Sequence, residues 1–368
     1  MRIISAELIG WRNYEHQSLE FESSPTILVG PNGQGKTNFI EALIYSALGH
    51  SHRTASDAVL VKSGAPEAII RMTVQHDTRR LAIDLRVTGS GANTIRVNGA
   101  ATKRRELARL LPLVLFAPED MELVRGEPEQ RRTFLNDLLA EASSALAGDI
   151  ADYDRVLRQR NTLLKSLRAA PAAAPTGTLN TWTDSLVVLA TRIMVARRHI
   201  VSELAPGLSA HYQAIASSSD FASITMSESI PDNTAEADIA NALRTLFHVK
   251  QRDEIDRGST LFGPHRDDMV IVLNDLPART HSSQGEAWSC ALSLRLAQVD
   301  IVRRGSIAGD PVVVLDDVFS ELDAGRRARL GEHLSGIEHL IITAADVATI
   351  PASLVGRQHT VLGGRIDA

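Results

Sequence analysis

The sequence GPNGQGKTN at residues 30–38 decides which fold the chain can adopt. It fits the pattern G-x-x-x-x-G-K-[ST] of a phosphate-binding loop in full. The apolar run PTILVG precedes it, and residues 36–48 follow with helical spacing that places Phe39, Ile40 and Leu43 on one face. A strand, a glycine loop and a helix in this order are the context that the motif requires. The sequence therefore predicts an α/β P-loop fold that binds a nucleoside triphosphate.

Each position of the loop has an expected task. Glycines allow backbone N–H groups to approach phosphate oxygens, and the start of the following helix favours an anion. Lys36 supplies a positive charge, and Thr37 offers a hydroxyl to Mg²⁺. A glycine-rich turn without this function is the alternative. We expect the nucleotide to contact the following residues: Gly30, Pro31, Asn32, Gly33, Gln34, Gly35, Lys36, Thr37 and Asn38.

The acidic half of a hydrolytic site occurs only near the other end of the chain. Residues 312–317 read VVVLDD, a buried strand that ends in two carboxylates. We expect Asp316 to hold Mg²⁺ or its water and Asp317 to orient and deprotonate the attacking water. The alternative is a strand that ends in two capping residues. Almost the whole chain separates the two halves of this site.

A serine-glycine turn, HSSQGEAWS at residues 281–289, opens a later helix. Such a turn exposes N–H groups at the positive end of a helix, so it can hold a phosphate. An ordinary helix start explains the same letters, with Ser283 as the N-cap and Glu286 at the capping-box position. The local sequence leaves both interpretations open.

The pattern of secondary structure divides the chain into three parts. Residues 1–125 and 259–368 alternate strands and helices, whereas residues 126–258 are mainly helical. We expect helices near 127–168, 179–204 and 236–257, with a break at 169–178 that makes the first two a hairpin arm. The prediction is an ATPase head with an N-terminal part (1–125) and a C-terminal part (259–368), and an inserted helical arm (126–258).

Composition narrows the class of protein and its partners. Cys290 is the only cysteine, which excludes an internal disulfide and a cysteine-rich zinc site. No apolar run reaches the roughly 18 residues of a membrane helix, and no signal peptide is visible, so we expect no membrane contact and a cytoplasmic location. The net charge is −5, so nucleic-acid binding would need local patches.

Four basic clusters could supply such patches. They are KRREL (103–107), QRR (130–132), RVLRQR (155–160) and ARRH (196–199). Each could equally be a solvated helix face. A further segment, FGPHRDD (262–268), is interpreted as a salt-bridged turn.

Several segments together resemble one group of proteins, the RecF-like members of the SMC-like DNA-repair ATPases, which have ABC-type heads. These segments are NYEHQSLEF, GPNGQGKTNFIEAL, LFAPEDMELVRGEPEQRRTFLND, LFGPHRDD, SSQGE and VVVLDDVFSELDAGRR, within residues 13–327. The phosphate loop alone is unspecific, but FAPEDMELVRGEPEQRR and GPHRDD are typical of RecF-like chains. The resemblance implies an α/β ABC-type head, ATP with Mg²⁺ as cofactors, and slow DNA-dependent ATP hydrolysis.

The resemblance also implies roles for residues outside the phosphate loop. Ser283, Gly285 and Glu286 match the signature segment, which closes over the nucleotide bound by a second copy, although Glu286 replaces a glutamine. Asp323 matches the D-loop aspartate. Asp317 stands where most ABC heads carry glutamate, which implies slow turnover. No histidine occupies the switch position after LIIT; Thr343 is nearest, and the Q-loop residue is not assigned.

The function implied by this resemblance is recombinational DNA repair. It includes an ATP-dependent homodimer, binding to duplex DNA and to junctions beside single-strand gaps, and cooperation with RecR, RecO and the RecA recombinase. One alternative is a DNA-binding clamp in which hydrolysis is incidental, and another is a different SMC-like or ABC ATPase. A transporter ATPase would keep its two nucleotide motifs much closer together than this chain does.

Overall fold

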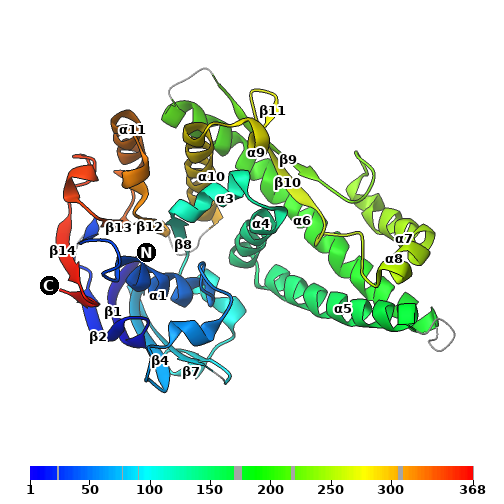
Figure 1. Cartoon of the computed structure of the whole chain (residues 1–368), viewed down its shortest axis with the longest axis horizontal. Helices are drawn as coiled ribbons and strands as arrows, with labels where there is room; N and C mark the ends of the chain where they lie inside the picture. The colour runs from blue at the N-terminus through cyan, green and yellow to red at the C-terminus, as the bar shows by residue number, and fades with distance from the viewer. Residues whose placement is uncertain are drawn as a thin grey trace.

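The computed structural model describes residues 1–22, 25–76, 78–89, 91–169, 176–216, 220–305 and 310–367. A broad head carries both chain termini, and a long helical arm projects from it (Figure 1). This arrangement confirms the predicted α/β head that is built from both ends of the chain and interrupted by a helical insertion.

A six-stranded sheet forms the centre of the head, with strand order β15-β14-β3-β13-β12-β8. The strands from β14 to β8 run parallel. Two of them come from the N-terminal part of the chain and four from the C-terminal part, so neither part can complete the sheet alone. Their bounds are β3 (Thr26–Val29), β8 (Leu113–Phe116), β12 (Val312–Asp316), β13 (His339–Ala344), β14 (Arg357–Leu362) and β15 (Arg365–Ile366).

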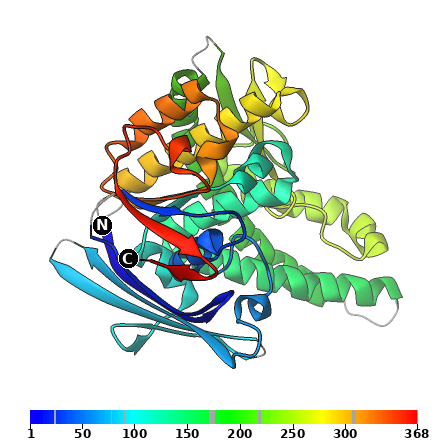
Figure 2. The ribbon, with the colours of Figure 1, turned by 60° about the vertical axis from the view of Figure 1, so that its left-hand side comes forward.

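A second, antiparallel sheet lies below the first, and helix α1 (Lys36–Leu48) fills the space between them (Figure 2). Residues 39–47 of α1 are buried on all sides because both sheets contact the helix. In the second sheet, the turn at Asn98 and Gly99 has positive φ angles of 51° and 81°, as a two-residue hairpin turn requires. The strands are β2 (Tyr14–Glu20), β1 (Arg2–Trp11), β4 (Glu67–His76), β5 (Arg79–Thr88), β6 (Thr94–Val97) and β7 (Ala100–Ala101).

Helices and a small third sheet cover the other face of the central sheet and share one hydrophobic core with it. The third sheet has the order β11-β10-β9. These elements are α3 (Met121–Arg125), α4 (Pro128–Ala142), β9 (Ala222–Ser227), β10 (Asp268–Leu273), β11 (Leu276–Pro277), α9 (Ala278–His281), α10 (Gln284–Gly305) and α11 (Ala324–Leu334). The short helix α2 (Leu107–Leu110) belongs instead to the core around α1.

The arm consists of α5 (Ser144–Ala169), the first half of α6 (Thr176–Ala216), α7 (Ile239–Val249) and α8 (Gln251–Arg257). A buried ion pair ties its helices together: Arg160 Nη2 lies 2.5 Å from Glu254 Oε2, and both side chains are almost fully buried. Arg160 also donates to Thr260 Oγ1 and lies over the Phe247 ring. Breaking such a pair costs far more than its net contribution, so it fixes one arrangement of the helices.

The segment FGPHRDD forms ionic and polar contacts, in keeping with the salt-bridged turn that its sequence indicates, and these contacts join the arm to the head. Asp268 accepts two hydrogen bonds from Arg131 of α4, at 2.7 and 2.8 Å. His265 Nδ1 lies 2.6 Å from the Tyr153 hydroxyl of α5. This segment thus contacts α4 in the head and α5 in the arm.

Helix boundaries differ from the sequence expectation where tertiary contacts decide them. α6 continues to Ala216 instead of ending near residue 204, although Pro206 lies inside it, because Leu208, Tyr212 and Ile215 are buried in the head core. The helix expected at 127–168 is interrupted at Ser143, and the one expected at 236–257 is interrupted at Lys250. Strand β9 was missed altogether.

The remaining boundaries are less sharp than the sequence suggests. The expected break at 169–178 falls partly on residues 170–175, which lie outside the described residues; Thr176 and the residues after it are helical. α6 contributes to the arm core with its first half and to the head core with its second half. The domain limits at 125/126 and 258/259 stay predictions.

Candidate functional site

The phosphate loop connects β3 to α1 and takes its shape from glycine. Gly33 and Gly35 have φ angles of 78° and 122°, which side-chain-bearing residues rarely adopt. At Gly30 a Cβ atom would lie 2.2 Å from the Val361 carbonyl oxygen of β14. The sequence pattern therefore reflects both the backbone shape and close packing against the C-terminal strand.

Residues from both chain ends hold this loop in place. The Tyr14 hydroxyl donates to the Gly35 carbonyl at 3.0 Å, and Asn13 Nδ2 donates to the Gln34 carbonyl at 3.1 Å. The Gly363 N–H donates to Gln34 Oε1 at 2.8 Å. Sequence reasoning assigned no role to Asn13 or Tyr14, although both lie in the segment NYEHQSLEF that it quoted.

Lys36 is almost fully buried at the end of the loop, with 5% of its surface exposed. Its Nζ donates to the carbonyl oxygens of Gly30 at 2.5 Å and Pro31 at 3.1 Å. Burial lowers the pKa of Lys36, while the nearby charges of Asp317 and Asp316 raise it. A buried cation beside two carboxylates at the start of a helix is suited to a phosphate chain with a divalent metal.

The sheet order brings Asp316 to the loop, as the sequence predicts. β13 lies between β3 and β12, and Asp316 is paired in register with Thr343. The Asp316 Oδ1 atom accepts from Thr37 Oγ1 at 3.2 Å and from Thr343 Oγ1 at 2.6 Å. Burial raises the pKa of Asp316, and the two threonine hydrogen bonds oppose that shift.

The oxygen atoms of Thr37 and Asp316 fit a magnesium site. Adjacent ligands of octahedral Mg²⁺ lie about 3 Å apart, close to their observed separation of 3.2 Å. Among the described residues, no group of three or more histidine, cysteine, aspartate or glutamate side chains could hold a metal. The metal would therefore take its other ligands from phosphate and water, which is how Mg²⁺ is bound beside nucleotides.

Asp317 follows directly in the left-handed backbone region, at φ 53° and ψ 27°. Its N–H donates to Thr343 Oγ1 at 3.0 Å, so one threonine hydroxyl contacts both acidic residues. Sequence reasoning named Thr343 only as the residue nearest the absent histidine. Its signal was its position at the end of β13, the strand next to β12.

Glu119 is a second residue that the sequence did not assign to the site. It follows β8, the strand on the other side of β12, and its charge contributes to the raised pKa of Asp316. The local sequence could not show that β8 and β12 are neighbours.

The signature turn and Asp323 form a separate group. Ser283 and Glu286 make the reciprocal capping box: the Ser283 N–H donates to Glu286 Oε2 at 2.7 Å, and the Glu286 N–H donates to Ser283 Oγ at 3.3 Å. These bonds lower the pKa of Glu286. Asp323 caps α11 by accepting from the Arg326 N–H at 3.0 Å. No hydrogen bond joins this group to the phosphate loop in the described part of the chain.

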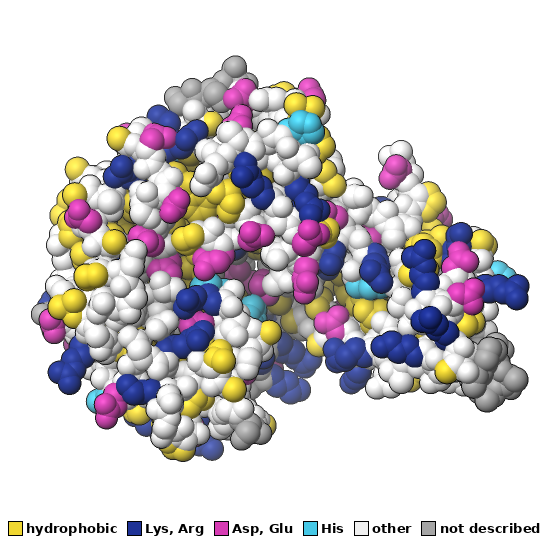
Figure 3. All heavy atoms as spheres, viewed as in Figure 1, with side chains coloured by type: hydrophobic (Ala, Val, Ile, Leu, Met, Phe, Trp, Pro, Cys, Tyr) yellow, Lys and Arg dark blue, Asp and Glu magenta, His cyan; other side chains and the backbone are white. Residues whose placement is uncertain are grey.

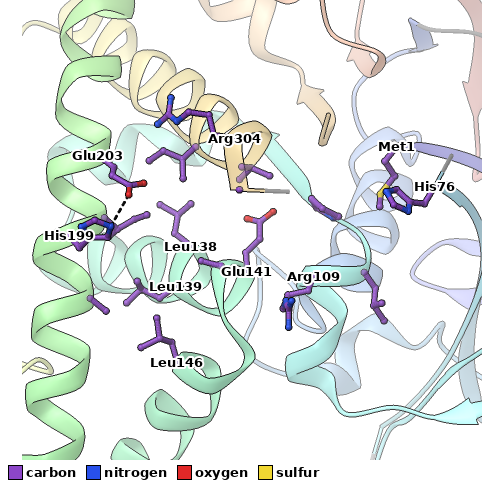
Figure 4. Close-up of a pocket in the computed structure, with 18 of the residues that line it drawn as sticks. Met1, His76, Arg109, Leu138, Leu139, Glu141, Leu146, His199, Glu203 and Arg304 are labelled. Carbon is purple, nitrogen blue, oxygen red and sulfur yellow. Dashed lines mark ion pairs between the residues drawn. The ribbon is translucent and has the colours of Figure 1, made fainter. Parts of the chain in front are cut away.

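A large cavity of about 790 Å³ lies elsewhere, between α2, α4, α6 and the end of α10 (Figure 4). None of the predicted site residues is among the described residues that line it. Glu141 of α4 points into the cavity, and its Oε1 is buried without a hydrogen-bond partner in the described structure. Burial raises the pKa of Glu141 to about 8.

We expect Glu141→Gln to stabilise the protein at pH 8 and to change little at pH 5. Because the pKa of Glu141 is raised, the folded state holds a proton that the unfolded chain releases. The contribution of this carboxyl group to stability is therefore fully present below its ordinary pKa and is lost as the pH rises toward 8. The residue is partly exposed, so we expect a gain of about 1–3 kcal/mol at pH 8. Chemical denaturation at both pH values measures it, with Glu129→Gln on the same helix as the control. An equal effect at the two pH values would contradict the assignment.

The four basic clusters separate into two kinds. Arg131 is buried against Asp268, Arg197 is buried against the Pro264 carbonyl, and Arg198 pairs with Glu228, so QRR and ARRH are structural. The basic residues of KRREL are exposed, and the nearby Arg109 of α2 donates to Ser144 at the start of α5. In RVLRQR, Arg155 and Arg158 are exposed, whereas Arg160 is buried in its ion pair with Glu254. Basic side chains follow the arm in Figure 3. The exposed residues are Lys103, Arg104, Arg105, Arg109, Arg155, Arg158, Lys165 and Arg168.

A search for membrane-spanning segments in the described residues finds no helix with the required length and apolarity.

Comparison with known proteins agrees with this geometry. The profile of the RecF/RecN/SMC N-terminal domain matches residues 2–351. The DNA replication and repair protein RecF of Leifsonia xyli subsp. xyli is 43% identical over 384 residues, covering 100% of this chain and 98% of that protein. RecF of Clavibacter michiganensis subsp. michiganensis is 42% identical over 377 residues, covering 97% and 93%.

Solved structures are similar over the same length. The recombination mediator protein RecF with ATP, from the RecFOR pathway, superposes with a TM-score of 0.91 at 27% identity and covers 99% of this chain and 96% of that one. An SMC head domain from Pyrococcus furiosus has a TM-score of 0.57 at 15% identity and shows the shared fold. The chain therefore belongs to the RecF/RecN/SMC family and, within it, to the DNA replication and repair proteins of the RecF type, with an ABC-type ATPase head.

Proposed function

We propose that this protein is an ATP-dependent DNA clamp for recombinational repair, whose ATPase site is completed by a second copy of the chain. ATP binds to residues 30–38, and Thr37 and Asp316 hold Mg²⁺ at its phosphates. Asp317 orients and deprotonates the attacking water. Slow, DNA-dependent hydrolysis then releases the closed homodimer.

The division of the site into two groups carries this proposal. Thr37 joins the phosphate loop to Asp316, and Thr343 of β13 donates to the same carboxylate. The signature turn and Asp323 make their hydrogen bonds within their own group. Hydrogen bonds in the described residues do not connect the two groups. In a dimer, a second copy would place four residues against the nucleotide bound at each phosphate loop, which completes the site: Ser283, Gly285, Glu286 and Asp323. ATP would then favour the closed dimer by its greater affinity for that state.

The exposed basic residues on α5 and beside it support DNA binding. They lie on the arm and at its base, so two arms of a closed dimer could contact the phosphates of one duplex with little base readout. The relatives carry the names DNA replication and repair protein and recombination mediator of the RecFOR pathway. On that basis we propose that the protein binds duplex DNA beside single-strand gaps and has RecR as its partner. Its function in the cytoplasm would be to help load RecA, in a pathway that includes RecO.

One feature favours a second candidate, a clamp in which ATP is bound and hydrolysis is incidental. The base is Asp317, one methylene shorter than the glutamate of most ABC heads. A shorter side chain reaches the attacking water less directly, so binding rather than turnover would then control the clamp. ATP turnover that leaves DNA release unchanged would favour this candidate.

Ser283→Arg tests the composite site. A bulky cation at the signature turn should block closure on a second copy, but it leaves the phosphate loop of its own subunit intact. We expect the ATP affinity of a single subunit to be unchanged and ATP-dependent dimerisation to fall at least tenfold, about 1.4 kcal/mol. Fluorescence anisotropy of a gapped duplex with ATP, with ADP and without nucleotide should show tight binding only for the wild type with ATP.

Ser335→Arg, an exposed change at the end of α11, is the matched control and should behave like the wild type. Sedimentation of both variants with ATP separates dimerisation from DNA binding. Equal dimerisation of the Ser283→Arg protein would refute the signature assignment. DNA binding that ignores the nucleotide would refute the ATP-controlled clamp.

A further inference from the structure

Arg326, in the first turn of α11, lies between the two elements that the proposed function directs at a second copy. Its Nη1 atom is 3.0 Å from Asp323 Oδ2, and its backbone N–H donates to Asp323 Oδ1 at the same distance. One residue therefore engages both oxygens of the D-loop carboxylate. These bonds lower the pKa of Asp323, with the backbone N–H as the largest cause.

The same guanidinium covers the signature turn. A Cβ atom on Gly285 would lie 2.9 Å from Arg326 Nη1 and 3.2 Å from Nη2, so the guanidinium packs closely against this glycine and a side chain there would require the arginine to shift. The positive charge also helps to lower the pKa of Glu286, after the larger effect of Ser283. The Arg326 side chain is thus a bridge from Asp323 to Gly285, between two segments that lie 38 residues apart in the sequence.

The arginine of this bridge is partly buried, whereas the carboxylate that it holds is exposed. The Arg326 side chain is 27% exposed and that of Asp323 is 56% exposed. The Nε–H of Arg326 is buried and has no hydrogen-bond partner among the residues that the structure describes. A buried guanidinium donor without a partner costs free energy.

We propose that Arg326 is a positioning residue that locks the signature turn and Asp323 into one rigid unit, which acts in trans on the nucleotide of a second copy. A planar guanidinium with fixed donor directions can hold a carboxylate and lie flat on a glycine backbone at once, whereas a lysine provides only a point charge. This inference rests on the proposed composite site, because Arg326 does not contact the phosphate loop of its own chain.

Arg326→Ala should leave ATP binding by a single subunit unchanged and lower the turnover of the dimer about 10- to 100-fold, the loss typical of a misplaced catalytic group. Arg326→Lys should recover only part of this loss. Arg329→Ala, on the same helix, is the matched control, because Arg329 Nε donates to the Ile215 carbonyl and does not touch Gly285. Thermal melting of all three variants identifies any simple loss of folding.

A mixing experiment decides between action in trans and in cis. The purified Arg326→Ala protein is mixed with an equal amount of the Asp317→Asn protein, which keeps its own Arg326 and phosphate loop. Half of the dimers formed at random are then mixed, and each has one intact site, so turnover should recover to about a quarter of the wild-type rate. No recovery, although both variants dimerise with ATP, would overturn the inference. Failure of the wild-type protein to dimerise with ATP would instead overturn the proposed function beneath it.

Discussion

Lys36→Ala is expected to lose ATP binding almost completely. Lys36 is the only lysine of the phosphate loop, and its Nζ is held in the buried loop by the Gly30 and Pro31 carbonyls, facing the charges of Asp316 and Asp317. Without the positive charge of Lys36, the repulsion between the negative phosphates and these two carboxylates would be less well neutralised. We expect affinity for ATP to fall at least about 100-fold, near 3 kcal/mol, in isothermal titration calorimetry.

Lys165→Ala is the control for this variant, since Lys165 is an exposed lysine of α5. It should bind ATP like the wild type, although it can weaken DNA binding. Because Lys36→Ala also leaves two loop carbonyls without their partner, its melting temperature must be measured alongside. A folded Lys36→Ala protein with wild-type ATP affinity would show that residues 30–38 do not bind the nucleotide.

Asp317→Asn is expected to separate ATP binding from hydrolysis. Asparagine keeps the shape of the side chain and tolerates the left-handed backbone at φ 53°, but it cannot accept a proton. Positioned general bases contribute about 10²–10⁴-fold, so turnover should fall by that factor while ATP affinity is retained. The ATP-bound dimer should then persist, which single-turnover kinetics and sedimentation with ATP would measure.

Asp275→Asn provides the matched control, because Asp275 also occupies the left-handed region, at φ 67°, but lies in the exposed β10–β11 turn. Turnover of this control should be unchanged. If Asp317→Asn hydrolyses ATP at the wild-type rate, another residue activates the water. Glu119, whose charge reaches Asp316 from the end of β8, is then the first residue to replace.

The parts of the candidate site that consist of consecutive residues could be predicted from the sequence. The motif from Gly30 to Asn38, with the apolar run before it, indicates a strand, a turn and a helix. Helix α1 begins and ends at the expected residues 36 and 48. The paired aspartates at the end of β12 were equally clear. For the signature turn, the capping box that was the simpler interpretation is formed in this chain, and the same turn remains available to a second copy.

Residues that act across the sheet could not be found in this way. Thr343 and Glu119 belong to the site only because β13 and β8 flank β12, and Asn13 only because the β1–β2 turn lies against the loop. The clusters QRR and ARRH look like KRREL in sequence, yet Arg131 and Arg197 are buried. Local charge patterns carry no information on the partner that a side chain meets.

The sequence by itself determined that this chain carries a phosphate-loop motif between a strand and a helix, that its head is α/β, and that helices interrupt the head. These properties depend on short-range patterns: glycine positions, 3.6-residue periodicity and apolar strands. Only the tertiary structure decided the order of the central strands, the length of α6 and the bridge from Arg326 to Gly285 and Asp323. Contacts between distant segments set these features, because burial and charge pairing depend on neighbours in space and not on neighbours along the chain.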